Sequence, residues 1–151
     1  MKPQYILVLL ALFAMPAFSQ DATPAPEAII VVPEFAPMDA TDLSLDEFKW
    51  IARPIVVFAD TPSDPRFQQQ IDLLMERPEA LIARDVVILV DTDPAARSAV
   101  RTALRPRGFS MVLLSKDGTV VLRKPAPWDV REITRAIDKL PLRKEEIREG
   151  G

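Results

Sequence analysis

The sequence predicts an α/β fold in three layers, in which a mixed four-stranded sheet has helices on both faces. Four short apolar runs rich in β-branched residues alternate with longer stretches whose apolar residues recur at helical spacing. The pairs Asp64-Pro65 and Asp93-Pro94 mark two helix starts, because aspartate caps a helix and proline fits its first turn. An Asp-Gly pair between the last two runs predicts a hairpin. The predicted order is β-α-β-α-β-β-α.

Residues 1–19 have the composition of an export signal that is removed by cleavage. Lys2 precedes an apolar run over residues 5–15, and small residues stand at positions 17 and 19. The run is too short to span a membrane, which takes about 20 apolar residues. We therefore expect an exported protein, periplasmic or secreted, that begins at Gln20 and keeps no stable membrane anchor.

Residues 20–42 are rich in proline and acidic residues and predict an extended, solvated arm. No basic residue occurs between position 20 and Lys49. The apolar stretch Ile29-Ile30-Val31-Val32 either adds an edge strand or remains a linker. The acids of this front part are Asp21, Glu27, Glu34, Asp39, Asp42, Asp46 and Glu47.

The compact domain is predicted over residues 43–148, with a tail at 149–151. Residues 55–59 form a continuous apolar run and predict a strand that is buried on both faces. The helix that begins after Asp64 is expected to end or kink at Pro78. Its predicted inward face consists of Phe67, Ile71, Leu74 and Met75.

Residues 86–90 predict the second strand, and residues 111–114 predict the third. Between them, a single helix is expected to run from Asp93 to about Leu104. Its predicted inward residues are Ala96, Val100, Ala103 and Leu104.

Asp117-Gly118 predicts a two-residue hairpin turn, followed by a strand over residues 119–123. Asp129 is expected to cap a last helix, which Pro141 ends, leaving a charged tail from Leu142 onward. The inward face of this helix is predicted to consist of Val130, Ile133, Ile137 and Leu140. Because a helix joins the first strand to the second, those two strands are expected to run parallel.

This arrangement is thioredoxin-like, and the chain resembles the DUF4174 family of exported bacterial proteins. Arg53-Pro54 before the first strand, Asp64-Pro65-Arg66 after it, and Lys116-Asp117-Gly118 in the hairpin carry the resemblance. It extends from Leu45 to Arg148. The resemblance implies a thioredoxin-like fold and no established activity.

The chain contains no cysteine and no histidine. Thiol–disulfide exchange and peroxide reduction by a thiolate are therefore excluded, as are metal sites built on cysteine or histidine. Ser110 aligns with the position before the third strand where redox thioredoxins have a cis-proline. We expect no cofactor, no metal site and no catalytic residue.

Weak ligand-binding candidates lie around the start of the first helix. Asp60 and Asp64 could divide acid and base roles, although an aspartate before proline is a capping signature. Arg66 in the first helical turn opposes the helix dipole, so it either binds an anion, helped by Gln69 or Gln70, or pairs with Asp64 or Asp60. The predicted ligand-binding set is Asp64, Arg66, Gln70 and Ser110.

Arg97, Arg101 and Arg105 fall on one stripe of the predicted second helix. The stripe is either a solvated face or a contact for the acidic arm or a partner. Nucleic acid is not expected, because the arm is acidic and the net charge of the chain is −3.

These features together predict a non-redox interaction module of the bacterial cell envelope that binds an envelope protein or a small ligand. Two alternatives remain open. One is a degenerate enzyme that uses the loop of residues 60–66, and the other is an accessory subunit that docks through its acidic arm.

Overall fold

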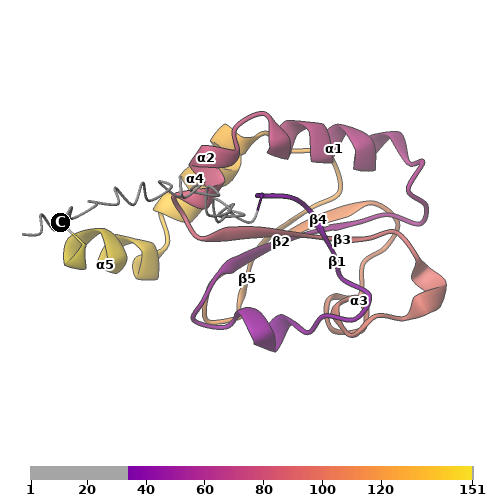
Figure 1. Ribbon diagram of the computed structural model, residues 1–151, viewed down its shortest axis with the longest axis horizontal. Helices are drawn as coiled ribbons and strands as arrows, with labels where there is room; N and C mark the ends of the chain where they lie inside the picture. The colour runs from indigo at the N-terminus through magenta and orange to yellow at the C-terminus, as the bar shows by residue number, and fades with distance from the viewer. Residues whose placement is uncertain (1–33, 151) are drawn as a thin grey trace, which may run out of the picture. The chain divides into compact units, whose positions relative to one another are not determined.

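The computed structural model describes residues 34–150, so the predicted signal segment and the stretch at 29–32 lie outside the described residues. A mixed sheet of five strands in the order β1-β3-β2-β4-β5 has helices on both faces (Figure 1). The predicted fold class is confirmed, with one strand more than expected. The strands are β1 (Met38–Asp39), β2 (Arg53–Phe58), β3 (Val86–Asp91), β4 (Ser110–Leu114) and β5 (Val120–Lys124).

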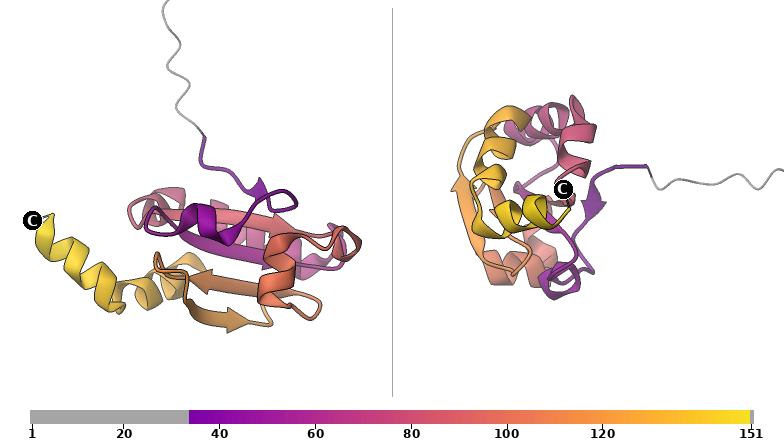
Figure 2. Two further views of the ribbon diagram at one scale, coloured as in Figure 1. Left: turned by 90° about the horizontal axis from the view of Figure 1, so that it is seen from below. Right: turned by 90° about the vertical axis from the view of Figure 1, so that its left-hand side faces the viewer.

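The helices divide between the two faces of the sheet, as Figures 1 and 2 show. One face is covered by α1 (Pro65–Met75), α2 (Pro78–Ile82) and α4 (Val130–Asp138). The other is covered by α3 (Ala99–Leu104) and the short 3-10 turn η1 (Leu45–Phe48). Two further segments are the 3-10 turn η2 (Pro94–Ala96) and the C-terminal helix α5 (Pro141–Glu149).

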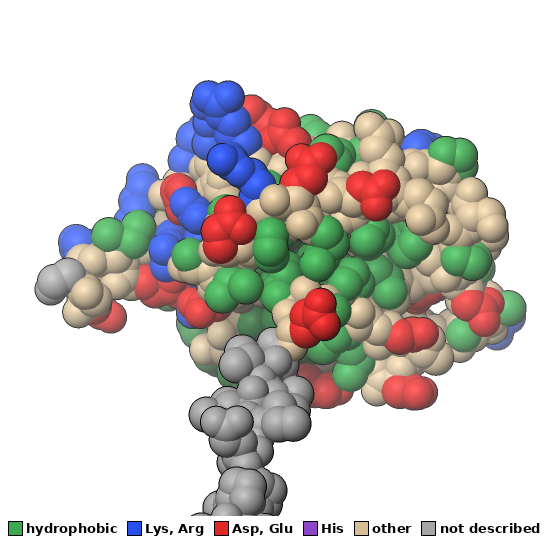
Figure 3. Space-filling model, turned by 45° about the horizontal axis from the view of Figure 1, so that its top comes forward, with side chains coloured by type: hydrophobic (Ala, Val, Ile, Leu, Met, Phe, Trp, Pro, Cys, Tyr) green, Lys and Arg blue, Asp and Glu red, His purple; other side chains and the backbone are tan. Residues whose placement is uncertain are grey.

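Successive side chains of β2 point to opposite faces of the sheet, so the strand contributes to two apolar cores, one on each face. Ile55 and Val57 face α1 and α4, while Val56 and Phe58 face α3. All four side chains are fully buried. On the α1 face, apolar side chains remain in view across the middle of the surface (Figure 3).

The extra strand β1 lies inside the segment that the sequence predicts as an extended arm, so the end of that segment is part of the sheet. Met38 and Asp39 pair in parallel with Leu89 and Val90 of β3. Ala40 is fully buried, and its N–H donates to the Val90 carbonyl at 2.9 Å. A pairing of two residues has no periodic pattern from which it could be predicted.

The hairpin between β4 and β5 differs from the predicted two-residue turn. Ser115 and Thr119 face each other, so Lys116, Asp117 and Gly118 form a three-residue loop. Gly118 has φ of +87°, the left-handed conformation with which such a loop closes. The Asp117 carboxylate accepts a hydrogen bond from the Thr119 N–H at 3.0 Å and fixes the turn.

The predicted helix from Asp93 to Leu104 is interrupted, which corrects the prediction. Arg97 has φ of +49°, and Ser98 starts a new helix by accepting a hydrogen bond from the Arg101 N–H at 3.0 Å. Because of this break, Ala96 and Ala103 are exposed, while Val100 and Leu104 are buried as predicted.

The predicted charged tail is helical. Helix α5 buries no residue, so an apolar face does not hold it in place. Glu146 on α5 instead pairs with Arg53, whose side chain is fully buried at the start of β2. Lys and Arg side chains gather at this end of the molecule, where α4 and α5 lie (Figure 3).

We expect amide hydrogen exchange to be slowest in β2 and β4. Both strands are buried at every position, whereas β3 has two half-buried residues and only the short β1 on its outer side. Exchange of core strands requires global unfolding, while strands near an edge open locally. Mass spectrometry or NMR can measure the exchange rates. Equal protection of the amides of β5 and β4 would contradict this ranking.

Within residues 34–150, none of the helices has the length and hydrophobicity of a membrane-spanning segment. No three acidic side chains in the same range lie close enough together to hold a metal ion.

Candidate functional site

The turn after β2 positions two of the predicted site residues. Asp64 caps α1 by accepting a hydrogen bond from the Arg66 N–H at 2.9 Å. The Arg66 guanidinium binds the same carboxylate at 3.0 Å. Hydrogen bonds from the Arg66 side chain, and then from its N–H, lower the pKa of the Asp64 carboxyl. Asp64 is thus an ionised cap with its charge already paired, which does not suit a general acid.

The structure gives Gln70 a structural role that the sequence analysis missed. Gln70 is fully buried on α1. Its amide N–H donates to the Trp128 carbonyl at 2.8 Å, and its amide oxygen accepts from the Trp128 N–H at 2.9 Å. Both ends of the side chain therefore fasten the segment before α4 to α1. These contacts within the fold, and not contact with a ligand, are what the structure shows for Gln70.

The arginine stripe predicted on one helix does not exist, because Arg97 and Arg105 both have positive φ and end separate segments. Arg101 turns inward to Asp91, the last residue of β3, at 2.7 Å. Its guanidinium also donates to the Ala59 carbonyl at 3.0 Å. Within the described residues, Arg101 is thus held by Asp91 and the Ala59 carbonyl.

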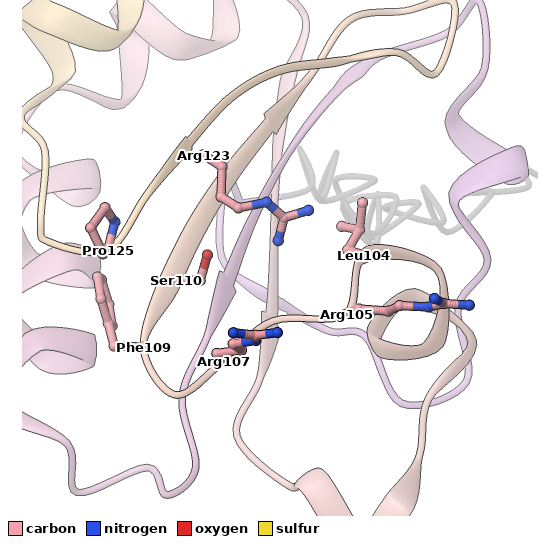
Figure 4. A pocket seen from close by; sticks show the side chains of 7 residues that line it. All are labelled: Leu104, Arg105, Arg107, Phe109, Ser110, Arg123 and Pro125. Atoms are coloured by element: carbon pink, nitrogen blue, oxygen red, sulfur yellow. The ribbon is translucent and has the colours of Figure 1, made fainter.

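A pocket of about 470 Å³ lies between the end of α3, the start of β4 and the end of β5. Figure 4 shows that Arg107 and Arg123 reach toward the space beside Ser110, whereas Arg105 extends away from it. We call this the arginine pocket. Its lining residues are Leu104, Arg105, Arg107, Phe109, Ser110, Arg123 and Pro125.

Among the described residues, three arginines and no acidic side chain line the arginine pocket. The Asp60 carboxylate lies nearby, with one oxygen 3.9 Å from the position that a Cβ on Gly108 would take. Within residues 34–150, the guanidinium groups of Arg105, Arg107 and Arg123 make no hydrogen bond or ion pair to protein. A second pocket, of about 260 Å³, contains Glu76 and Asp129 beside its two arginines and so balances its own charge.

Ser110 is the polar group at the back of the arginine pocket. It is the first residue of β4, pairs with Phe58 of β2 and is only 5% exposed. Its hydroxyl is not hydrogen-bonded to any of the described residues, so it is free to donate to a ligand. Figure 4 shows the hydroxyl pointing into the pocket. Of the four predicted ligand-binding residues, Ser110 is the one that lies here.

The sequence analysis missed Arg107 and Arg123 as site residues. They come from the loop before β4 and from β5, which the hairpin register brings side by side by pairing Arg123 with Val112. Gly108 has φ of +59° and turns the chain between Arg107 and β4. An isolated arginine in an amphipathic strand has no local signal, so only the register of the hairpin could have pointed to Arg123.

The chemistry of the arginine pocket is that of binding. It contains hydrogen-bond donors, positive charge and apolar surface, but no carboxylate that could act as a base and no nucleophile activated by one. Guanidinium groups recognise carboxylate and phosphate oxygens in bidentate geometry.

The sequence matches a family described as "Domain of unknown function (DUF4174)" over residues 44–146. A comparison with curated proteins gave no match.

Solved structures of thioredoxin-like proteins are similar in fold. Reduced 2-Cys peroxiredoxin from Plasmodium vivax has a TM-score of 0.53 and 16% identity, covering 68% of this chain and 85% of that one. Reduced desulfothioredoxin from Desulfovibrio vulgaris Hildenborough has a TM-score of 0.51 and 19% identity, covering 70% and 97%. A thioredoxin-fold protein from Helicobacter pylori has a TM-score of 0.50 and 10% identity, covering 75% and 81%. At these identities the likeness shows the fold and nothing about activity.

Proposed function

The chain belongs to the DUF4174 family, and we propose that it is an exported, non-redox binding module that holds an anionic ligand in the arginine pocket. The observation that carries this proposal is that the guanidiniums of Arg107 and Arg123 reach into one cavity without a partner among the described residues, and that no acid is among its lining residues. An anion bound between two positive charges is attracted by both.

The rest of the molecule supports binding over catalysis. The chain has no cysteine for the thiolate chemistry common on this fold. In the loop of residues 60–66, Asp64 is used as a helix cap and as the partner of Arg66. The arginine pocket therefore offers the better-equipped site.

Thermal unfolding in the presence of anions tests this function. A ligand that binds only the folded state stabilises it by about 2.7 kcal/mol at a concentration one hundred times its Kd. We expect phosphate and organic anions to raise Tm above that in chloride at matched ionic strength. The double variant Arg107→Gln/Arg123→Gln should lose the effect.

Arg97→Gln is the matched control, because Arg97 is exposed and lies outside the pocket. This variant should respond to anions as the parent does. An equal loss of response in Arg97→Gln and in the double variant would contradict a localised site.

Export is part of the same proposal and rests on the composition of residues 1–19. Sequencing the N-terminus of the protein recovered from a periplasmic or culture fraction tests it. A chain beginning at Gln20 is the expected result. A chain that stays in the cytoplasm with its first residues intact would contradict export.

A further inference from the structure

Three hydrogen-bond donors reach the arginine pocket from three separate segments. Arg107 comes from the loop before β4, Ser110 from the first position of β4, and Arg123 from β5. In Figure 4 both guanidiniums lie on the same side of the Ser110 hydroxyl, that of Arg123 above it and that of Arg107 below it. Donors that converge from different directions match an anion whose oxygens also point in different directions.

A phosphate monoester meets that requirement. It presents three terminal oxygens and a charge between −1.5 and −2 near neutral pH. Arg107 and Arg123 supply two positive charges in forked geometry, and the Ser110 hydroxyl can donate to the third oxygen. A carboxylate has two oxygens in one plane and a single charge, so it would leave one donor and one charge unmatched.

The apolar wall of the pocket indicates what the phosphate carries. Leu104 lies on one side of the Ser110 hydroxyl, and Phe109 and Pro125 lie on the other (Figure 4). Binding sites commonly combine such apolar lining with a few placed polar groups. Leu104 and Phe109 are only 7% and 2% exposed, so the apolar surface open to a substituent is mainly that of the exposed Pro125.

From these observations, and resting on the proposed function, we infer that the arginine pocket binds a phosphate monoester with an apolar organic group. Arg107, Ser110 and Arg123 hold the phosphate, and Pro125 contacts the organic group. Arg105, which extends away from the hydroxyl in Figure 4, contributes long-range attraction at the rim.

Calorimetric titration with phenyl phosphate and benzoate tests the inference, because the two ligands share a ring and differ in the anionic group. We expect phenyl phosphate to bind at least about tenfold more tightly than benzoate. Inorganic phosphate, which lacks the ring, should also bind more weakly than phenyl phosphate.

Variants locate the contacts. Arg107→Gln and Arg123→Gln should each weaken phenyl phosphate binding at least about tenfold, and Ser110→Ala about fivefold. Arg123→Lys keeps the positive charge but cannot form a bidentate contact, so its loss of affinity should be intermediate. Arg97→Gln should bind phenyl phosphate as the parent does, and circular dichroism should show that every variant is folded.

The phosphate monoester could belong to a soluble metabolite or to a lipid headgroup. Sedimentation with vesicles that contain phosphatidic acid, a monoester, against vesicles that contain phosphatidylglycerol, a diester, separates these sources. Binding to phosphatidic acid that depends on Arg107 and Arg123 supports the monoester on a lipid. Phenyl phosphate binding without vesicle binding supports it on a soluble molecule.

Three results would contradict the inference, and their consequences differ. Benzoate binding as tightly as phenyl phosphate, with both lost in Arg107→Gln, overturns the monoester and leaves the proposed anion site intact. No binding of either ligand overturns both. If Arg97→Gln lost as much affinity for phenyl phosphate as Arg107→Gln, binding would depend on the overall charge of the protein. This result would also overturn the inference.

Discussion

Replacing Asp91 with alanine is expected to lower the free energy of unfolding by about 3–5 kcal/mol. Asp91 is 4% exposed and accepts hydrogen bonds from Arg101 at 2.7 Å and from the Ser98 hydroxyl at 2.6 Å. Its loss leaves the Arg101 guanidinium largely buried against the Phe58 ring, without a counter-ion. Urea unfolding followed by tryptophan fluorescence measures the change.

The double variant Asp91→Ala/Arg101→Met distinguishes the contribution of the ion pair to stability from the contribution of side-chain packing. Replacing a buried pair by apolar side chains is often close to neutral, whereas removing one partner is costly. We therefore expect the double variant to be more stable than Asp91→Ala alone. A loss below about 1 kcal/mol in Asp91→Ala, typical of exposed pairs, would show that this contact is not a buried pair in solution.

The second large effect is expected at Glu146. Its carboxylate accepts hydrogen bonds from Arg53 at 2.8 Å and from Arg143 at 3.2 Å, and it lies 3.0 Å from the Lys116 ammonium. Glu146→Gln leaves the fully buried Arg53 without a charged partner. We expect a loss on the order of 3 kcal/mol, which urea unfolding at neutral pH would measure.

The pH dependence of that loss follows from the pKa of Glu146. Partial burial raises this pKa, but the hydrogen bonds from Arg53, Lys116 and Arg143 outweigh burial and lower it from 4.5 to about 2. A pKa that is lower in the folded state stabilises the protein above the unfolded value, and the stabilisation disappears as the pH falls through the folded value.

The difference in stability between parent and Glu146→Gln should thus be largest above pH 4.5 and should shrink toward pH 2. Arg148→Gln, at an exposed position of α5, is the control and should change stability little at any pH. A difference between parent and Glu146→Gln that stayed constant over this range would contradict the assigned role of the Glu146 charge.

Local signals predict the fold well where one element carries its own pattern. The continuous apolar run at β2 and the Asp64-Pro65 pair before α1 are confirmed by the structure. On α4, Val130, Ile133 and Ile137 are buried as predicted.

Prediction fails where a distant residue decides the local structure. The break before α3 depends on Ser98, which both caps α3 and donates to Asp91 seven residues earlier. The helical C-terminus depends on Glu146 and its buried partner Arg53, which lie 93 positions apart. No helical or strand periodicity encodes such contacts.

The candidate site shows the same limit. Ser110 could be selected from the sequence because it aligns with a position known from redox thioredoxins. Arg107 and Arg123 could not, because their shared pocket arises from the pairing of β4 with β5. The loop of residues 60–66 carries the stronger local signals in the sequence, although Asp64 and Arg66 form an ion pair with each other in the structure.

The central claim is that an anion binds in the arginine pocket, and a nitrogen–proton correlation spectrum recorded during titration with phenyl phosphate tests it most directly. The predicted result is a set of saturable shifts centred on the amides of Arg107, Phe109, Ser110 and Arg123, with the turn around Asp64 unchanged. Shifts centred on Asp64 and Arg66, or no saturable shift at the arginine pocket, would contradict it.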